Sequence, residues 1–191
     1  MTPVNIMLVG VGGQGSLLAT KILGHLLMTR GHDVKVSEVH GMSQRGGSVV
    51  TYLRFGEKVY SPILDQGEAD IIVSFEQLEA ARWLPCLKPG GHMLTNTQIM
   101  EPMPVIAGLA KYPENIIEKM RALGVEVVAM DCLALAQQAG SAKSVNLVLM
   151  GRLSRYFPEI PEEAWQDAIA ACVKPSFLEL NRRAFALGRE A

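Results

Sequence analysis

Cysteine is scarce in this sequence, and its copies are far apart. Cys86, Cys132 and Cys172 show none of the paired spacings of disulfide frameworks or zinc sites. Three separated thiols also cannot supply the four ligands of an iron–sulfur cluster. We therefore expect no metal site in this chain. We expect a reducing cytoplasm as its location, because no basic and apolar leader precedes the first predicted strand.

An excess of charge of either sign is also missing. Lys and Arg total 18 against 19 Asp and Glu, so there is no electrostatic reason to expect nucleic acid or an anionic membrane as partner. Apolar runs are far shorter than the roughly 20 residues that span a bilayer. The sequence is nevertheless 49% hydrophobic and only 19% charged, which is typical of a buried parallel sheet or of a covered subunit interface.

The motifs of self-contained catalysis are absent too. There is no Gly-Lys-Ser/Thr phosphate loop, no nucleophile elbow and no His-Glu-x-x-His helix. His25, His32 and His92 fall in the first predicted helix, a turn and a strand, where they are read as structural or solvated. Only His40 adjoins a polar loop, which makes it the one histidine that is a candidate for an acid–base role. We therefore assign no catalytic residue to this chain.

What the sequence contains is an alternation of strands and helices. Residues 4–9, a glycine turn, a helix over 16–30 and a strand over 34–39 predict an opening βαβ unit with a right-handed crossover. Residues 48–55 and 58–62, joined by Gly56-Glu57, predict a β-hairpin. Further strands are expected at 69–75, 92–96 and 125–130, and further helices at 76–84, 113–123, 132–139, 144–157, 162–172 and 176–187.

These elements predict one domain over residues 1–191, because single cores commonly reach this length. The expected fold is α/β and three-layered, Rossmann-like, with a mostly parallel sheet, a β-hairpin insertion and a helical C-terminal third.

The first glycine segment is Gly10-Val11-Gly12-Gly13-Gln14-Gly15, directly between a strand and a helix. Its spacing fits a dinucleotide fingerprint, in which a helix starting near Gly13 would direct free N–H groups at an anion, and Glu38 would be the acidic ribose partner. The same spacing also fits a tight turn without ligand. The candidate binding residues here are Gly12, Gly13, Gln14, Gly15 and Glu38.

The second glycine segment is His40-Gly41-Met42-Ser43-Gln44-Arg45-Gly46-Gly47, and it is more specific, since an ordinary dinucleotide unit does not need it. Arg45 carries a charged fork suited to carboxylate or phosphate, or else pins the loop to Glu38. Glycine pairs permit backbone nests that bind anions. Both segments follow strands, where open α/β sheets bind ligands. The ligand- or partner-binding candidates are His40, Met42, Ser43, Gln44, Arg45, Gly46 and Gly47.

Both glycine segments, together with Phe75-Glu76-x-x-Glu79-Ala80-x-Arg82 and Asn96-Thr97, resemble the gamma domain of 2-oxoacid:ferredoxin oxidoreductases. A free-standing domain of this size is most similar to the beta subunit of the indolepyruvate branch. The resemblance runs through most of the chain.

This resemblance implies a subunit without cofactor in a hetero-oligomer. A large partner subunit would hold thiamine diphosphate, magnesium and iron–sulfur clusters. The complex would decarboxylate an aryl pyruvate, pass electrons to ferredoxin and form an acyl-CoA, and the chain alone would be inactive. Pyruvate, 2-oxoisovalerate or 2-oxoglutarate as substrate, and a stand-alone NAD-binding oxidoreductase, are the alternatives. Without its partner, the apolar chain is expected to form a two-fold dimer.

Overall fold

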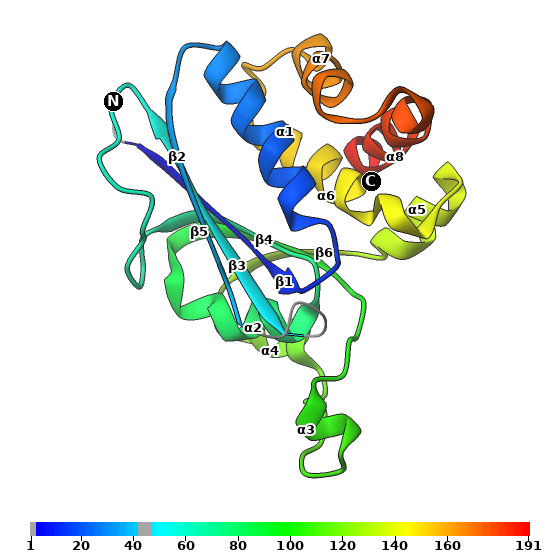
Figure 1. Cartoon of the computed structure of the whole chain (residues 1–191). Helices are drawn as coiled ribbons and strands as arrows, with labels where there is room; N and C mark the ends of the chain where they lie inside the picture. The colour runs from blue at the N-terminus through cyan, green and yellow to red at the C-terminus, as the bar shows by residue number, and fades with distance from the viewer. Residues whose placement is uncertain (1–2, 42–46) are drawn as a thin grey trace.

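The computed structural model describes residues 3–41 and 47–191. Within them, helices cover both faces of one six-stranded sheet of order β2-β3-β1-β4-β5-β6 (Figure 1). The strands are β1 Val4–Val11, β2 Asp33–His40, β3 Ser48–Gly56, β4 Ala69–Ser74, β5 Leu87–Asn96 and β6 Glu126–Met130. The helices are α1 Ser16–Thr29, α2 Gln77–Trp83, α3 Met103–Ile106, α4 Ile116–Ala122, α5 Cys132–Ala139, α6 Val145–Leu153, α7 Glu162–Cys172 and α8 Leu178–Glu190.

The sheet has a core on each face because its strands alternate buried side chains between them. In β1, Ile6 and Leu8 pack with α1 and the C-terminal helices, whereas Met7 and Val9 pack with α2 and α4. β1 is therefore apolar on both sides, as expected for a central strand of a three-layer fold.

One antiparallel strand lies between the two strands of the predicted opening βαβ unit. β1, β2, β4, β5 and β6 run in one direction, and β3 runs against them between β1 and β2. The mostly parallel sheet is confirmed, but β1 and β2 are parallel without being neighbours. Consequently β2 and β3, not residues 48–62, form the hairpin.

The predicted return strand over residues 58–62 is wrong. No strand is assigned to this range, and the Val59 amide instead donates to Asp33 Oδ2 at 2.9 Å. The physical reason is that β3 already pairs along both edges, with β1 and with β2. A third strand had no free edge to join.

The helical C-terminal third is confirmed and packs on the α1 face of the sheet (Figure 1). α6 and α8 touch through two glycines. A Cβ on Gly151 would lie 2.0 Å from the Phe185 carbonyl oxygen, and one on Gly188 would lie 1.9 Å from that of Val148. Only glycine permits this separation of the two helices.

The parallel strands all end at one edge of the sheet, which we call the carboxyl edge, and β3 begins there. The turns after β1, β4, β5 and β6 therefore lie together at the edge where β2 ends at His40 and β3 begins at Ser48. In the described part of the chain, no helix combines the length and the hydropathy needed to cross a bilayer.

Candidate functional site

The two glycine segments meet at the carboxyl edge. The Gly12 amide donates to the Gly47 carbonyl at 2.9 Å, next to the last β1–β3 pair, Val11 with Ser48. Met42, Ser43, Gln44, Arg45 and Gly46 lie outside the described residues, so the binding role predicted for them stays a prediction. The structure does show that Gly47, which follows them, is hydrogen-bonded to the first glycine segment, and that His40, on their other side, lines a hollow with Gly12 and Gly13.

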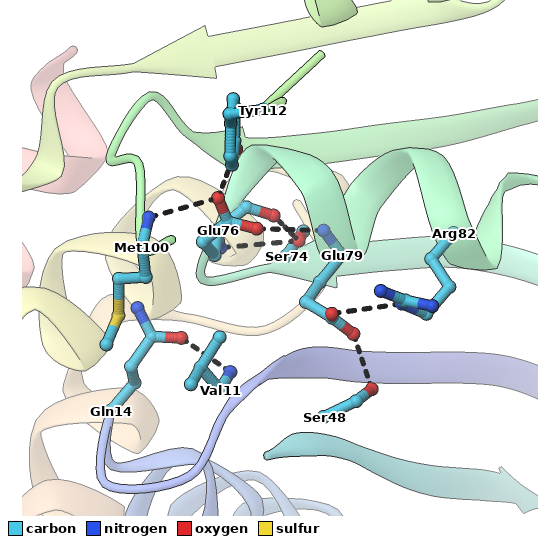
Figure 2. Close-up of polar contacts among 9 residues, drawn as sticks. All are labelled: Val11, Gln14, Ser48, Ser74, Glu76, Glu79, Arg82, Met100 and Tyr112. Atoms are coloured by element: carbon cyan, nitrogen blue, oxygen red, sulfur yellow. Dashed lines mark hydrogen bonds and ion pairs between the residues drawn. The ribbon is translucent and has the colours of Figure 1, made fainter. Parts of the chain in front are cut away.

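Gln14 is engaged inside the protein. Its Oε1 accepts from the Val11 amide at 2.8 Å, and its Nε2 donates to the Phe75 carbonyl at 3.0 Å (Figure 2). This amide fills the space beside Gly10, where a Cβ would lie 2.8 Å from Gln14 Oε1. Asn96 Nδ2 donates to the same Phe75 carbonyl at 3.2 Å. Two amides therefore tie the turns after β1, β4 and β5 together.

Gly15 starts α1. Its φ of 86° lies in the left-handed region that favours glycine, and its carbonyl accepts from Asn146 Nδ2 at 3.2 Å. The helix begins at Ser16, where the apolar spacing predicted it and not near Gly13 as in the dinucleotide interpretation, and it has no side-chain cap. The glycine turn before the helix borders a hollow of about 620 Å³, which is lined by Gly12, Gly13, Gln14, Gly15, Gln98, Met100, Leu133, Ala142, Lys143 and Val145.

Glu38 and His40 do come close to the first glycine segment. With Gly12 and Gly13 they line a hollow of about 340 Å³, but the Glu38 carboxylate also contacts His40 Nδ1 and the Thr51 hydroxyl, each at 3.4 Å. In a dinucleotide fold the second strand lies beside the first, whereas here β3 separates them. This arrangement favours a structural turn over a ribose site.

Glu76 is a buried carboxylate to which sequence reasoning assigned no role. It is 1% exposed and stands at the N-cap of α2, where Oε2 accepts from the Glu79 amide at 2.9 Å. Oε1 accepts from the Met100 amide at 3.3 Å and from the Tyr112 hydroxyl (Figure 2). Burial, and then the bond to Glu76, raise the pKa of Tyr112, so the phenol keeps its proton and donates it.

Glu79, also buried, points to the opposite side of the same helical turn. Its carboxylate accepts from the Ser48 hydroxyl and from Arg82 Nε at 3.1 Å (Figure 2). The first turn of α2 therefore holds both the start of β3 and the segment from Met100 to Tyr112. The sequence signal for this pair is the Glu76-x-x-Glu79 spacing, which belongs to the family resemblance but does not by itself indicate a function.

The three thiols are protonated. Burial raises the pKa of Cys132 to about 12 and also raises the pKa values of Cys86 and Cys172. Nucleophilic attack and metal ligation require the thiolate. Across residues 3–41 and 47–191, no group of three or more His, Cys, Asp or Glu side chains is placed to hold a metal ion.

Fold and site together define an α/β domain in which amide and carboxylate side chains link the turns at the carboxyl edge to one another. Open α/β sheets bind their ligands at this edge. The family model described as pyruvate ferredoxin/flavodoxin oxidoreductase matches residues 5–191, and the chain belongs to this family.

Two relatives from one organism, Thermococcus kodakarensis, differ in their similarity to this chain. Its "Indolepyruvate oxidoreductase subunit IorB" is 43% identical over 198 residues, covering 100% of this chain and 96% of the relative. Its "Pyruvate/ketoisovalerate oxidoreductases common subunit gamma" is 23% identical over 183 residues, covering 95% of this chain and 92% of the relative.

Solved structures share the fold. The pyruvate oxidoreductase subunit PORC from Thermotoga maritima superposes with a TM-score of 0.77 at 20% identity, covering 100% of this chain and 97% of that one. A 2-oxoglutarate:ferredoxin oxidoreductase from Magnetococcus marinus superposes with a TM-score of 0.75 at 19% identity, covering 100% of this chain but 31% of that one. The same fold thus also occurs as one part of a longer polypeptide.

Proposed function

We propose that this chain is the subunit without cofactor of an indolepyruvate:ferredoxin oxidoreductase. The observation that carries the proposal is the full-length 43% identity to a protein named as an indolepyruvate oxidoreductase subunit, against 23% to the pyruvate/ketoisovalerate subunit of the same organism. The complex oxidatively decarboxylates an aryl pyruvate to an acyl-CoA and passes the electrons to ferredoxin.

The proposed division of labour leaves the redox chemistry to the large partner subunit. Thiamine diphosphate with magnesium supplies the decarboxylation, and iron–sulfur clusters supply the electron transfer. What supports the absence of iron–sulfur clusters from this chain is its cysteine content, since Cys86, Cys132 and Cys172 are far apart in the sequence and fewer than the four thiolates of such a cluster. The complex works in the cytoplasm, and the chain without its partner forms a two-fold dimer, which light scattering can test.

This chain contributes binding and orientation at the carboxyl edge. Gly41 to Gly47 faces the partner and shapes the path of the 2-oxoacid or CoA, with Arg45 as the cation that meets a carboxylate or phosphate. Support comes from the flanks of this loop, where Gly47 is held by Gly12 and Ser48 by Glu79.

Replacing Arg45 with Ala tests the loop. If Arg45 binds an anion, the complex assembles but kcat/KM for the 2-oxoacid or CoA falls roughly tenfold or more, as expected for the loss of a charge-assisted hydrogen bond of about 1.5–3 kcal/mol. Normal turnover in an intact complex would refute the role of Arg45.

The function itself is tested by coexpressing the chain with the thiamine-binding large subunit of the same genome. Reduction of ferredoxin should require indolepyruvate, CoA and both subunits, with kcat/KM for indolepyruvate about tenfold or more above that for pyruvate, 2-oxoisovalerate or 2-oxoglutarate. Failure to form a complex would contradict the proposal. Calorimetric binding of NAD to the chain alone would favour the dinucleotide alternative.

A further inference from the structure

A segment of thirteen residues, from Ile99 to Lys111, projects beyond the carboxyl edge, and we call it the arm. Figure 1 shows α3, near its tip, standing clear of the sheet and of the other helices. Four of its large apolar side chains are more than half exposed, with Leu109 at 83%. These side chains are Ile99, Met103, Ile106 and Leu109.

The arm has its own fixed shape. Amides of Leu109 and Ala110 both donate to the Pro104 carbonyl, at 2.8 and 3.1 Å, and Gly108 has a φ of 71°, which suits this tight return. Both ends of the arm are held by one buried carboxylate, because Glu76 accepts from the Met100 amide and from the Tyr112 hydroxyl (Figure 2). Binding through the arm therefore loses little conformational entropy.

The chemistry of the arm is apolar. Between Glu101 and Lys111, the sequence Pro-Met-Pro-Val-Ile-Ala-Gly-Leu-Ala carries no charged side chain. A rigid, uncharged and convex projection is complementary to a concave apolar surface on another protein.

We propose that the arm docks into an apolar groove of the large, thiamine-binding partner subunit. This inference rests on the proposed function, which supplies the partner. The argument for this occupant is continuity: Glu76 holds the arm while Glu79, on the same turn of α2, holds Ser48 at the end of the Gly41–Gly47 loop. The arm and Ser48 are therefore fixed to one turn, at the same carboxyl edge that is proposed to face the partner.

A second copy of this chain fits the arm poorly. The hollow of about 770 Å³ at the opposite edge of the sheet is lined not only by Phe55 and Phe157 but also by charged residues, among them Arg30, Asp70 and Lys88, so it is a poor match for an uncharged arm. An arm placed there would join copies head to tail, and a head-to-tail contact builds an open chain of copies and not a closed two-fold dimer. Contact between two arms offers thirteen residues a side, fewer than the roughly 20–30 of a stable interface.

The test measures binding of the large subunit to the double variant Ile106→Asp/Leu109→Asp. Both side chains are exposed, so the fold and the free energy of unfolding should stay unchanged, as circular dichroism and urea unfolding would verify. The matched control is Leu123→Asp, 74% exposed, at the end of α4 that leads into the amino end of β6, at the opposite edge. We expect Kd to rise about tenfold or more for the double variant and to change less than about twofold for the control.

The outcomes separate the arm from the function. If the wild-type chain binds the large subunit and the double variant binds equally well, the arm proposal is wrong while the proposed function stands. If the wild-type chain does not bind the large subunit at all, the proposed function fails first. If the double variant loses only self-association by light scattering, or only binding to phosphatidylglycerol vesicles, the occupant is a second copy or a membrane, and the proposal is overturned.

Discussion

Single buried polar groups at the carboxyl edge decide how its loops are placed. Gln14 matched a ligand-binding position by sequence, yet its amide bonds to Phe75, 61 residues away. Glu76 was visible only as part of a motif, and its partners Met100 and Tyr112 lie 24 and 36 residues along the chain. A sequence shows the residue types but not such distant partners, so the glycine turn was predictable and the side chains that hold it were not.

At this scale we predict that Tyr112→Phe destabilises the protein. Removing the hydroxyl leaves the Glu76 carboxylate with one donor fewer in a buried position, which should lower the free energy of unfolding by about 1–3 kcal/mol. Urea unfolding measures this change. Tyr60→Phe is the control, because Tyr60 is 88% exposed and should change by less than about 0.5 kcal/mol. Equal effects of the two variants would show that the Tyr112 hydroxyl contributes nothing specific.

Among the secondary-structure elements, the local sequence pattern predicted most strands and helices. The error came from the pairing of strands, which the local pattern does not show. The range over residues 58–62 has strand-like composition, but its pairing depends on whether β3 has an unoccupied edge, and both edges are taken by β1 and β2. The close contact of α6 and α8 at Gly151 and Gly188 could not be predicted from the local sequence either. The helices themselves were expected from spacing, but their separation depends on where two glycines 37 positions apart meet.

This crossing predicts opposite results for two glycine substitutions in buried helices. Gly151→Ala places a methyl group 2.0 Å from the Phe185 carbonyl oxygen, so α8 must shift, and we expect a loss of about 1–3 kcal/mol or more. Gly24→Ala in α1 meets nothing within 4 Å and should stabilise by about 0.5–1 kcal/mol through helix propensity. Thermal unfolding of both variants measures the contrast. A neutral Gly151→Ala would mean that the two helices are not tightly packed there.

For the whole molecule, the order of the strands in the sheet could be predicted only in part from the sequence. The α/β class and the helical C-terminal third followed from alternation and spacing. The position of β3 between two parallel strands did not, because order in a sheet depends on contacts between distant segments.

Global stability should fall at high pH, with Cys132 contributing to the decline. In the native protein its thiol has a pKa of about 12, whereas in the unfolded chain a thiol ionises near pH 9. Between these values the unfolded state has lost a proton that the native state keeps, so the free energy of unfolding decreases by about 1.4 kcal/mol per pH unit for this group. Cys132→Ala should flatten the wild-type pH profile by that slope from about pH 9.5 to 11, as measured by urea unfolding. Parallel profiles would contradict the assignment.

β1 enters the sheet at Val4, on the edge away from the arm and the glycine segments. An affinity tag or a fluorophore joined ahead of this strand therefore sits far from the carboxyl edge. A chain immobilised by such a tag would present that edge to solution in a uniform orientation, which makes surface-based capture of the large subunit a practical measurement.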